Sequence, residues 1–87
     1  MLRVAYAEGR DHNMKLGKLL RVRRQKANIS LRDVAAAVGA SKTYLYEVEN
    51  GKTANIGLVL AAKLSKTLRI PMSTLAATAL ADDKSRK

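Results

Sequence analysis

The chain has 87 residues, and its seventeen Lys and Arg against seven Asp and Glu give a formal net charge of +10. That length predicts one compact domain with a thin core, and the absence of cysteine excludes disulfides, thiolate metal sites and cysteine nucleophiles. The charge favours a polyanionic partner, because each phosphate that a Lys or Arg neutralises releases bound counterions. An anionic membrane surface or an ordinary solvated basic surface would account for the same charge.

The sequence indicates neither a membrane span nor a secretory signal. No stretch approaches the roughly 20 consecutive apolar residues that a spanning helix needs. The first six residues are followed within a few positions by the charged residues Glu8, Arg10 and Asp11, which argues against a signal peptide. We therefore expect a protein of the cytoplasm without a membrane partner.

Apolar residues recur at intervals of three and four along the chain, which predicts an all-α protein. Residues 1–13 lack this periodicity and are interpreted as an N-terminal arm. The first helix is expected over about Met14–Ala27, with Leu16 and Leu20 on its buried face and Asn13 or Asp11 as its N-cap.

The next two helices are short and close together. Ser30 is the expected N-cap of a helix over Leu31–Val38, and Gly39 is expected to end that helix in a left-handed conformation. A third helix begins after Ser41, a second N-cap candidate, and ends near Asn50. Two helices of this length joined by a few residues are typical of a helix-turn-helix motif.

Two further helices and a tail complete the predicted bundle. A fourth helix over about Gly57–Leu68 is expected to pack through Leu58, Ala61, Leu64 and Leu68. Pro71 suits the start of a fifth helix over about Met72–Leu80. The domain is thus expected over residues 14–80, followed by a polar C-terminal tail at 81–87, of which Asp82–Lys87 is predicted to be disordered.

Several spaced segments resemble the xenobiotic-response-element/Cro/C1-type helix-turn-helix regulators. The stretch from Ile29 to Ser41 is similar to the first half of that domain, and Tyr44–Lys52 is similar to its hydrophobic-Glu-x-Gly-Lys signature. Residues 64–70 look like its fourth helix and the following turn. The segment Ser41–Leu45, together with Asn55, resembles the small controller proteins of restriction-modification systems and other mobile elements.

The resemblance implies a compact five-helix bundle of the lambda-repressor-like type. It also implies a bacterial, nucleoid-associated regulator that binds double-stranded DNA as a homodimer on a pseudo-palindromic operator, as repressor or activator, and that also regulates its own gene. We expect no small-molecule ligand, and no enzyme activity because nothing pairs a nucleophile with a base. No cofactor or metal is expected either, since His12 is the sole histidine.

The resemblance also assigns candidate base contacts to the third helix, namely Lys42, Thr43, Tyr44, Tyr46 and Glu47. Lys can donate to guanine and the Thr methyl can pack on a thymine methyl. For the two tyrosines, stacking on a base or sugar and simple padding of the domain surface are equal alternatives. Glu47 is either an acceptor for cytosine N4 or an ordinary helix residue.

Candidate phosphate contacts are Ser30, Arg32, Ser41, Asn50, Lys52 and Asn55. Capping alone would explain both serines. Leu31 stands where the family often has a Gln that touches the DNA backbone, so that contact is expected to be lost. Arg21 and Arg23 would add non-specific affinity or act only as solvated charges. The resemblance further implies a structural ion pair between Arg24 and Glu49.

The apolar content of the last helix exceeds what a monomer of this size needs to bury. We therefore expect a homodimer interface on the last two helices, built from Leu58, Met72, Leu75 and Leu80. Its two reading helices would lie one DNA turn apart. The alternative is an antitoxin or protein-interaction module of a toxin-antitoxin or mobile-element system. A basic amphipathic membrane binder is disfavoured, because a core needs the apolar stripes.

Overall fold

The computed structural model describes residues 15–53 and 55–85. This part of the chain contains five helices and no strand, so the predicted all-α class is confirmed. The helices are α2 (Leu16–Lys26), α3 (Leu31–Val38), α4 (Lys42–Glu49), α5 (Leu58–Leu68) and α6 (Met72–Ser85). The predicted arm at 1–13, with its proposed caps Asp11 and Asn13, lies outside the described residues.

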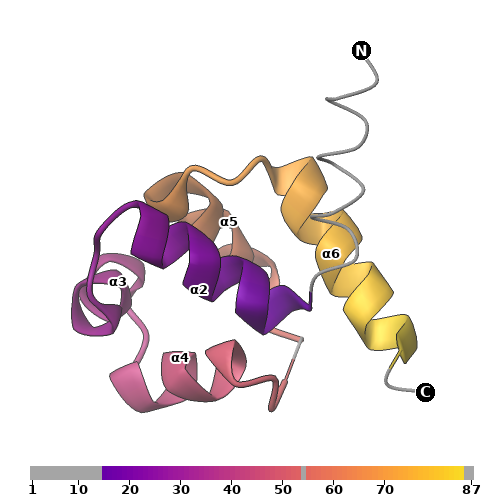
Figure 1. The fold of residues 1–87 in the computed structure, drawn as a ribbon, viewed down its shortest axis with the longest axis horizontal. Helices are drawn as coiled ribbons and strands as arrows, with labels where there is room; N and C mark the ends of the chain where they lie inside the picture. The colour runs from indigo at the N-terminus through magenta and orange to yellow at the C-terminus, as the bar shows by residue number, and fades with distance from the viewer. Residues whose placement is uncertain (1–14, 54, 86–87) are drawn as a thin grey trace.

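Helix α2 lies at the centre of the arrangement (Figure 1). It packs against α4, α5 and α6, while α3 packs against α4 and α5. Leucines at three- and four-residue spacing on α2 supply one wall of the core, and the Val34–Val38 stripe of α3 supplies another. The buried core consists of Leu16, Leu19, Leu20, Val34, Ala35, Val38, Leu45, Val48, Leu64, Leu68, Ile70 and Leu75.

The ends of α3 and α4 are fixed by local side chains and by one glycine. Ser30 Oγ accepts the backbone N–H of Asp33 at 3.0 Å, and Ser41 Oγ accepts that of Tyr44 at 3.0 Å. Gly39 ends α3 with φ of 72°, a left-handed conformation that glycine adopts without steric cost. The predicted bounds of α3 and the predicted start of α4 are therefore confirmed.

Two expectations about the outer helices are wrong. Helix α6 does not end near Leu80 but continues to Ser85, so the disorder predicted from Asp82 onward is wrong for residues 82–85. The reason is that Asp82 is buried against the start of α2 and holds the end of α6 there. Leu58 does not pack into the core, since 78% of it is exposed. Helix α2 begins at Leu16 and ends at Lys26, close to the bounds expected for it.

Candidate nucleic-acid interface

Helix α4 rests on the core with one face and leaves the other open. Leu45 and Val48 are buried, whereas Lys42, Thr43 and Glu47 are exposed and Tyr46 is 60% exposed. Tyr44 is partly buried and packs against the core, which favours the padding interpretation for most of that side chain. The N-terminal half of α4 therefore presents a lysine and a threonine to solvent, as a helix that enters a major groove must.

The C-terminal end of α4 is joined to α2 by a bidentate ion pair. Arg24 Nε lies 2.7 Å from Glu49 Oε2, and Arg24 Nη2 lies 3.1 Å from Glu49 Oε1. Arg24 Nη1 also donates to the backbone carbonyl of Ile29 at 3.1 Å, just ahead of α3. The Glu49 carboxylate raises the pKa of Arg24, chiefly through this hydrogen bonding. The pair implied by the resemblance thus joins α2, the start of α3 and α4.

A glycine in α2 allows the close approach that this pair requires. Gly17 is buried, and a Cβ built on it would lie 2.3 Å from the carbonyl oxygen of Val48 and 2.6 Å from that of Glu49. Both contacts are to backbone, which cannot swing aside. Only glycine lets α2 pass this near to the end of α4. This role could not be predicted from the sequence, since a helical glycine whose packing partner is unknown is simply a weak helix former.

Arg21 and Asn50 form a second, more exposed link at the same place. Arg21 Nη2 donates to Asn50 Oδ1 at 3.2 Å, and Arg21 Nε lies 3.5 Å from Glu49 Oε1. Asn50 Nδ2 donates to the carbonyl of Tyr46 at 2.7 Å. Arg21, interpreted above as a source of non-specific affinity or a solvated charge, is therefore part of the network that fixes α4.

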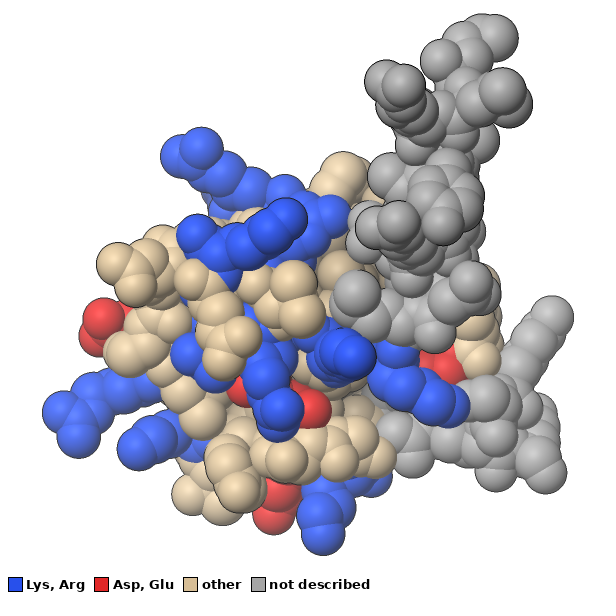
Figure 2. Space-filling view, viewed as in Figure 1, with Lys and Arg blue, Asp and Glu red and all other residues tan. Residues whose placement is uncertain are grey.

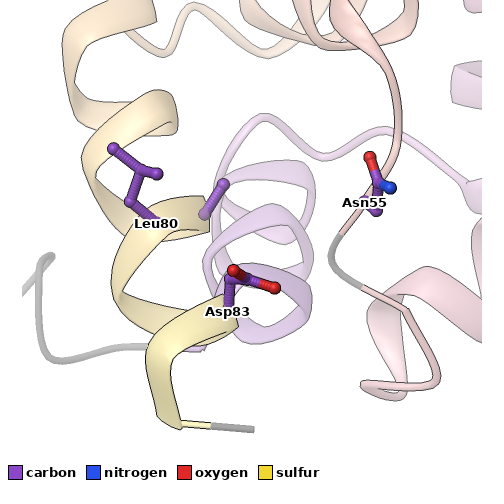
Figure 3. Close-up of a pocket in the computed structure, with 4 residues that line it drawn as sticks. Asn55, Leu80 and Asp83 are labelled. Carbon is purple, nitrogen blue, oxygen red and sulfur yellow. The ribbon is translucent and has the colours of Figure 1, made fainter. Parts of the chain in front are cut away.

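The candidate phosphate contacts divide by location. Ser30 and Ser41 are exposed N-caps of α3 and α4, and Arg32 and Lys52 are exposed near these helices. Asn55 instead lines a pocket with three residues of α6, namely Ala79, Leu80 and Asp83 (Figure 3). The structure therefore associates Asn55 with α6 and with one of the proposed dimer residues.

A model of the helix-turn-helix family matches residues 20–75 of this chain, which span helices α2 to α6 in part or in full. The chain belongs to the helix-turn-helix family. It is also similar to control protein C.MunI from Mycoplasma sp, with 38% identity over 58 residues that cover 67% of this chain and 77% of that protein. No solved structure matches the chain significantly.

Membership of this family confirms the resemblance to Cro/C1-type proteins, and together with the similarity to C.MunI it supports a DNA-binding regulator of the controller-protein type. The α3–turn–α4 unit is its helix-turn-helix. Figure 2 shows Lys and Arg side chains over much of the face that contains α2, with few acidic side chains among them. Such a surface is suited to the DNA backbone.

The described part of this helix-turn-helix chain contains neither a candidate metal site nor a helix suited to span a membrane. Residues 15–53 and 55–85 hold no group of three His, Cys, Asp or Glu that could bind a metal ion. None of their helices is both long enough and apolar enough to cross a membrane.

The expected dimer residues are not all at the surface. Leu58, Met72 and Leu80 are exposed, but Leu75 is only 2% exposed and belongs to the core. Leu75 is therefore wrong as an interface residue, because it has no surface to offer a partner. Val59, which was not expected, is exposed beside Leu58 at the start of α5. The missed signal is the run of apolar residues over 58–60, only part of which one helix face can bury.

Proposed function

We propose that this chain is a homodimeric, sequence-specific regulator that binds a pseudo-palindromic operator, including one upstream of its own gene. The observation that supports this most directly is the exposure of the N-terminal half of α4, while Leu45 and Val48 on its opposite face are buried in the core. In the proposal, the two α4 helices of a dimer enter successive major grooves one DNA turn apart. The protein then acts in the bacterial cytoplasm, at the nucleoid.

The proposed reading residues are the exposed ones on α4. Lys42 donates to guanine O6 or N7, and the methyl group of Thr43 packs on thymine. Glu47 accepts from cytosine N4, while Tyr46 stacks on a sugar or base. The exposure of these four side chains supports the proposed base and sugar contacts, because each can reach a groove without any change in the core.

The proposed phosphate contacts orient the domain without reading sequence. Arg32 and Lys52 supply positive charge, and the helix N-termini at Ser30 and Ser41 supply backbone N–H groups and a favourable dipole. Ser30 and Ser41 already cap their helices, so each hydroxyl has only its O–H left to donate to DNA.

The dimer is proposed to form through the exposed apolar side chains of α5 and α6, which are Leu58, Val59, Met72 and Leu80. Large apolar side chains left in water on two helices that pack together favour burial against a partner. A second copy of the same chain satisfies this with an isologous contact. Pairing of the two copies then sets the distance between the two α4 helices.

A gel-shift titration tests the proposal. The probes are the DNA upstream of the protein's own gene and a duplex of the same length and composition with scrambled sequence, compared over a salt series. We expect the upstream duplex to remain bound at salt concentrations that release the scrambled one, by a factor of about 10³ or more in affinity. Equal affinities with a steep common salt dependence would contradict the proposal.

A further inference from the structure

The C-terminal end of α4 lacks the charges that stabilise a helix end. Its last turn contains Glu47 and Glu49 and no basic residue. Negative charge at a helix C-terminus opposes the helix dipole, so α4 needs cations from elsewhere. Helix α2 supplies them as Arg21 and Arg24. Arg24 binds the Glu49 carboxylate, and Arg21 Nη2 lies 3.5 Å from the backbone carbonyl of Glu49, at the end of the helix.

Arg21 also determines which way the Asn50 amide points. A guanidinium is only a donor, so it can bind only the Oδ1 atom of Asn50, at 3.2 Å. The Tyr46 carbonyl is only an acceptor, so it can bind only the Nδ2 atom, at 2.7 Å. These two partners together allow a single orientation of the amide. Among the described residues, the second Nδ2 hydrogen has no acceptor.

We infer that Arg21 is a positioning residue for DNA binding, which holds Asn50 so that its side chain meets a phosphate only as a hydrogen-bond donor. Phosphate oxygens accept hydrogen bonds and cannot donate them, so the Oδ1 atom would be useless or repulsive there. Arg21 thus acts through Asn50 and not by its own contact with DNA. This inference rests on the proposed function and on the expectation, from the family resemblance, that Asn50 contacts a phosphate.

The first test uses the protein without DNA. The side-chain amide of Asn50 is followed by NMR in the wild type, in Arg21→Ala and in Lys18→Ala. Lys18 is an exposed basic residue on the same helix, so its replacement controls for the loss of one positive charge. We expect Arg21→Ala to speed the exchange of the Asn50 amide hydrogens with water by about tenfold, while the backbone amides of α4 stay protected. An unchanged Asn50 amide would overturn the inference.

The second test is a double-mutant cycle on DNA affinity with Arg21→Ala, Asn50→Ala and the double variant. Each single variant is expected to bind about three- to tenfold more weakly, the size of one hydrogen bond, and the double variant no more weakly than the weaker single one. Losses that multiply would show two independent contacts and overturn the inference. Arg21→Ala is also expected to leave the salt slope unchanged, whereas a direct phosphate contact would lower it by about 1.

The cycle is measured on both a selected and a random duplex, because a phosphate contact does not depend on sequence. If the wild type shows no sequence preference, the proposed function fails, yet the cycle on random DNA still decides the role of Arg21. Thermal unfolding of each variant confirms that it is folded at the assay temperature. If Arg21→Ala is unfolded at that temperature, the two tests use Arg21→Lys in its place. A single ammonium cannot span both Glu49 and Asn50, so the same losses are expected.

Discussion

The carboxylate of Asp82 in α6 accepts a hydrogen bond from the backbone N–H of Leu16, the first residue of α2, at 3.1 Å. Helix α2 has no acidic residue in its first turn, and Lys15 at its N-cap makes no side-chain cap. Asp82 thus performs the role of an N-cap from 66 positions away in sequence. Lys15 Nζ lies 3.6 Å from the other carboxylate oxygen. The last helix is thereby joined to the start of the central one.

Replacing Asp82 with alanine should therefore destabilise the whole domain. The substitution leaves the buried Leu16 N–H without this acceptor and removes a favourable charge from the start of α2, at a cost of about 1–3 kcal/mol. Urea unfolding followed by circular dichroism measures the change in the free energy of unfolding. Asp83→Ala is the matched control, since Asp83 is the next residue and is exposed. Equal losses for the two variants would contradict the capping role.

Gly17→Ala should destabilise the protein although alanine is the better helix former. In an open helix this change would stabilise by about 1 kcal/mol. Here the new methyl group would stand 2.3 Å from the Val48 carbonyl oxygen, so α4 must shift away from α2. We expect a loss of about 1–3 kcal/mol, as for other overpacked sites, together with weaker DNA binding. Chemical denaturation and a gel shift measure the two effects, and a gain in stability would show that no close approach exists.

Breaking the pair between Arg24 and Glu49 should be costly at every ordinary pH. Glu49→Gln leaves the largely buried Arg24 without its ionic partner, at about 3 kcal/mol. Glu47→Gln is the control, since Glu47 is exposed on the same helix and should change stability by less than about 0.5 kcal/mol. Denaturant titration of both variants decides between a structural pair and a surface charge.

The pH dependence of this pair follows from the direction of the Arg24 pKa. Folding raises that pKa, so the contribution of Arg24 is complete below its ordinary value and is lost only as the pH rises through the folded value. Because Arg stays protonated, the stability difference between Arg24→Ala and the wild type should be constant from about pH 6 to about pH 10. A difference that declines within that range would mean that another titrating group dominates.

Leu58→Glu should separate the proposed dimer into monomers. A carboxylate at this exposed position of α5 would be buried without a partner in the interface, and we expect the dimer dissociation constant to rise at least about 100-fold. Sedimentation equilibrium measures it. Tyr46→Ala is the control, because it removes an exposed apolar side chain from α4 and should leave the dimer intact. If both variants sediment as the wild type does, the dimer does not use the start of α5.

Local signals made most of the fold predictable. The Ser30 and Ser41 caps, Gly39 and the Val34–Val38 stripe each act within a few residues, so the sequence reveals them directly. Asp82 and Gly17 were missed because their partners, Leu16 and Val48, are distant in sequence. An aspartate near a polar C-terminus is typical of a tail until a helix start is known to lie beside it.

The candidate site likewise has features that the sequence predicts and features that depend on contacts between helices. Exposure of Lys42, Thr43 and Tyr46 follows from the helical period, which assigns Leu45 and Val48 to the core. The same period could not show that Leu75 faces the core while Leu80 faces solvent, because Ala and Thr fill all four positions between them and leave α6 without a clear apolar stripe. Nor could it show that Arg21 binds Asn50, a contact made between two helices.

Base reading by the exposed half of α4 can be measured through the base-preference profile of Lys42→Ala. The profile is obtained by selection from random duplexes, beside the wild type and Lys52→Ala. We expect Lys42→Ala to relax the preference at one position of each half-site by about 1–3 kcal/mol, and Lys52→Ala to weaken binding to all sequences alike. A Lys42→Ala profile identical to that of the wild type would contradict this expectation.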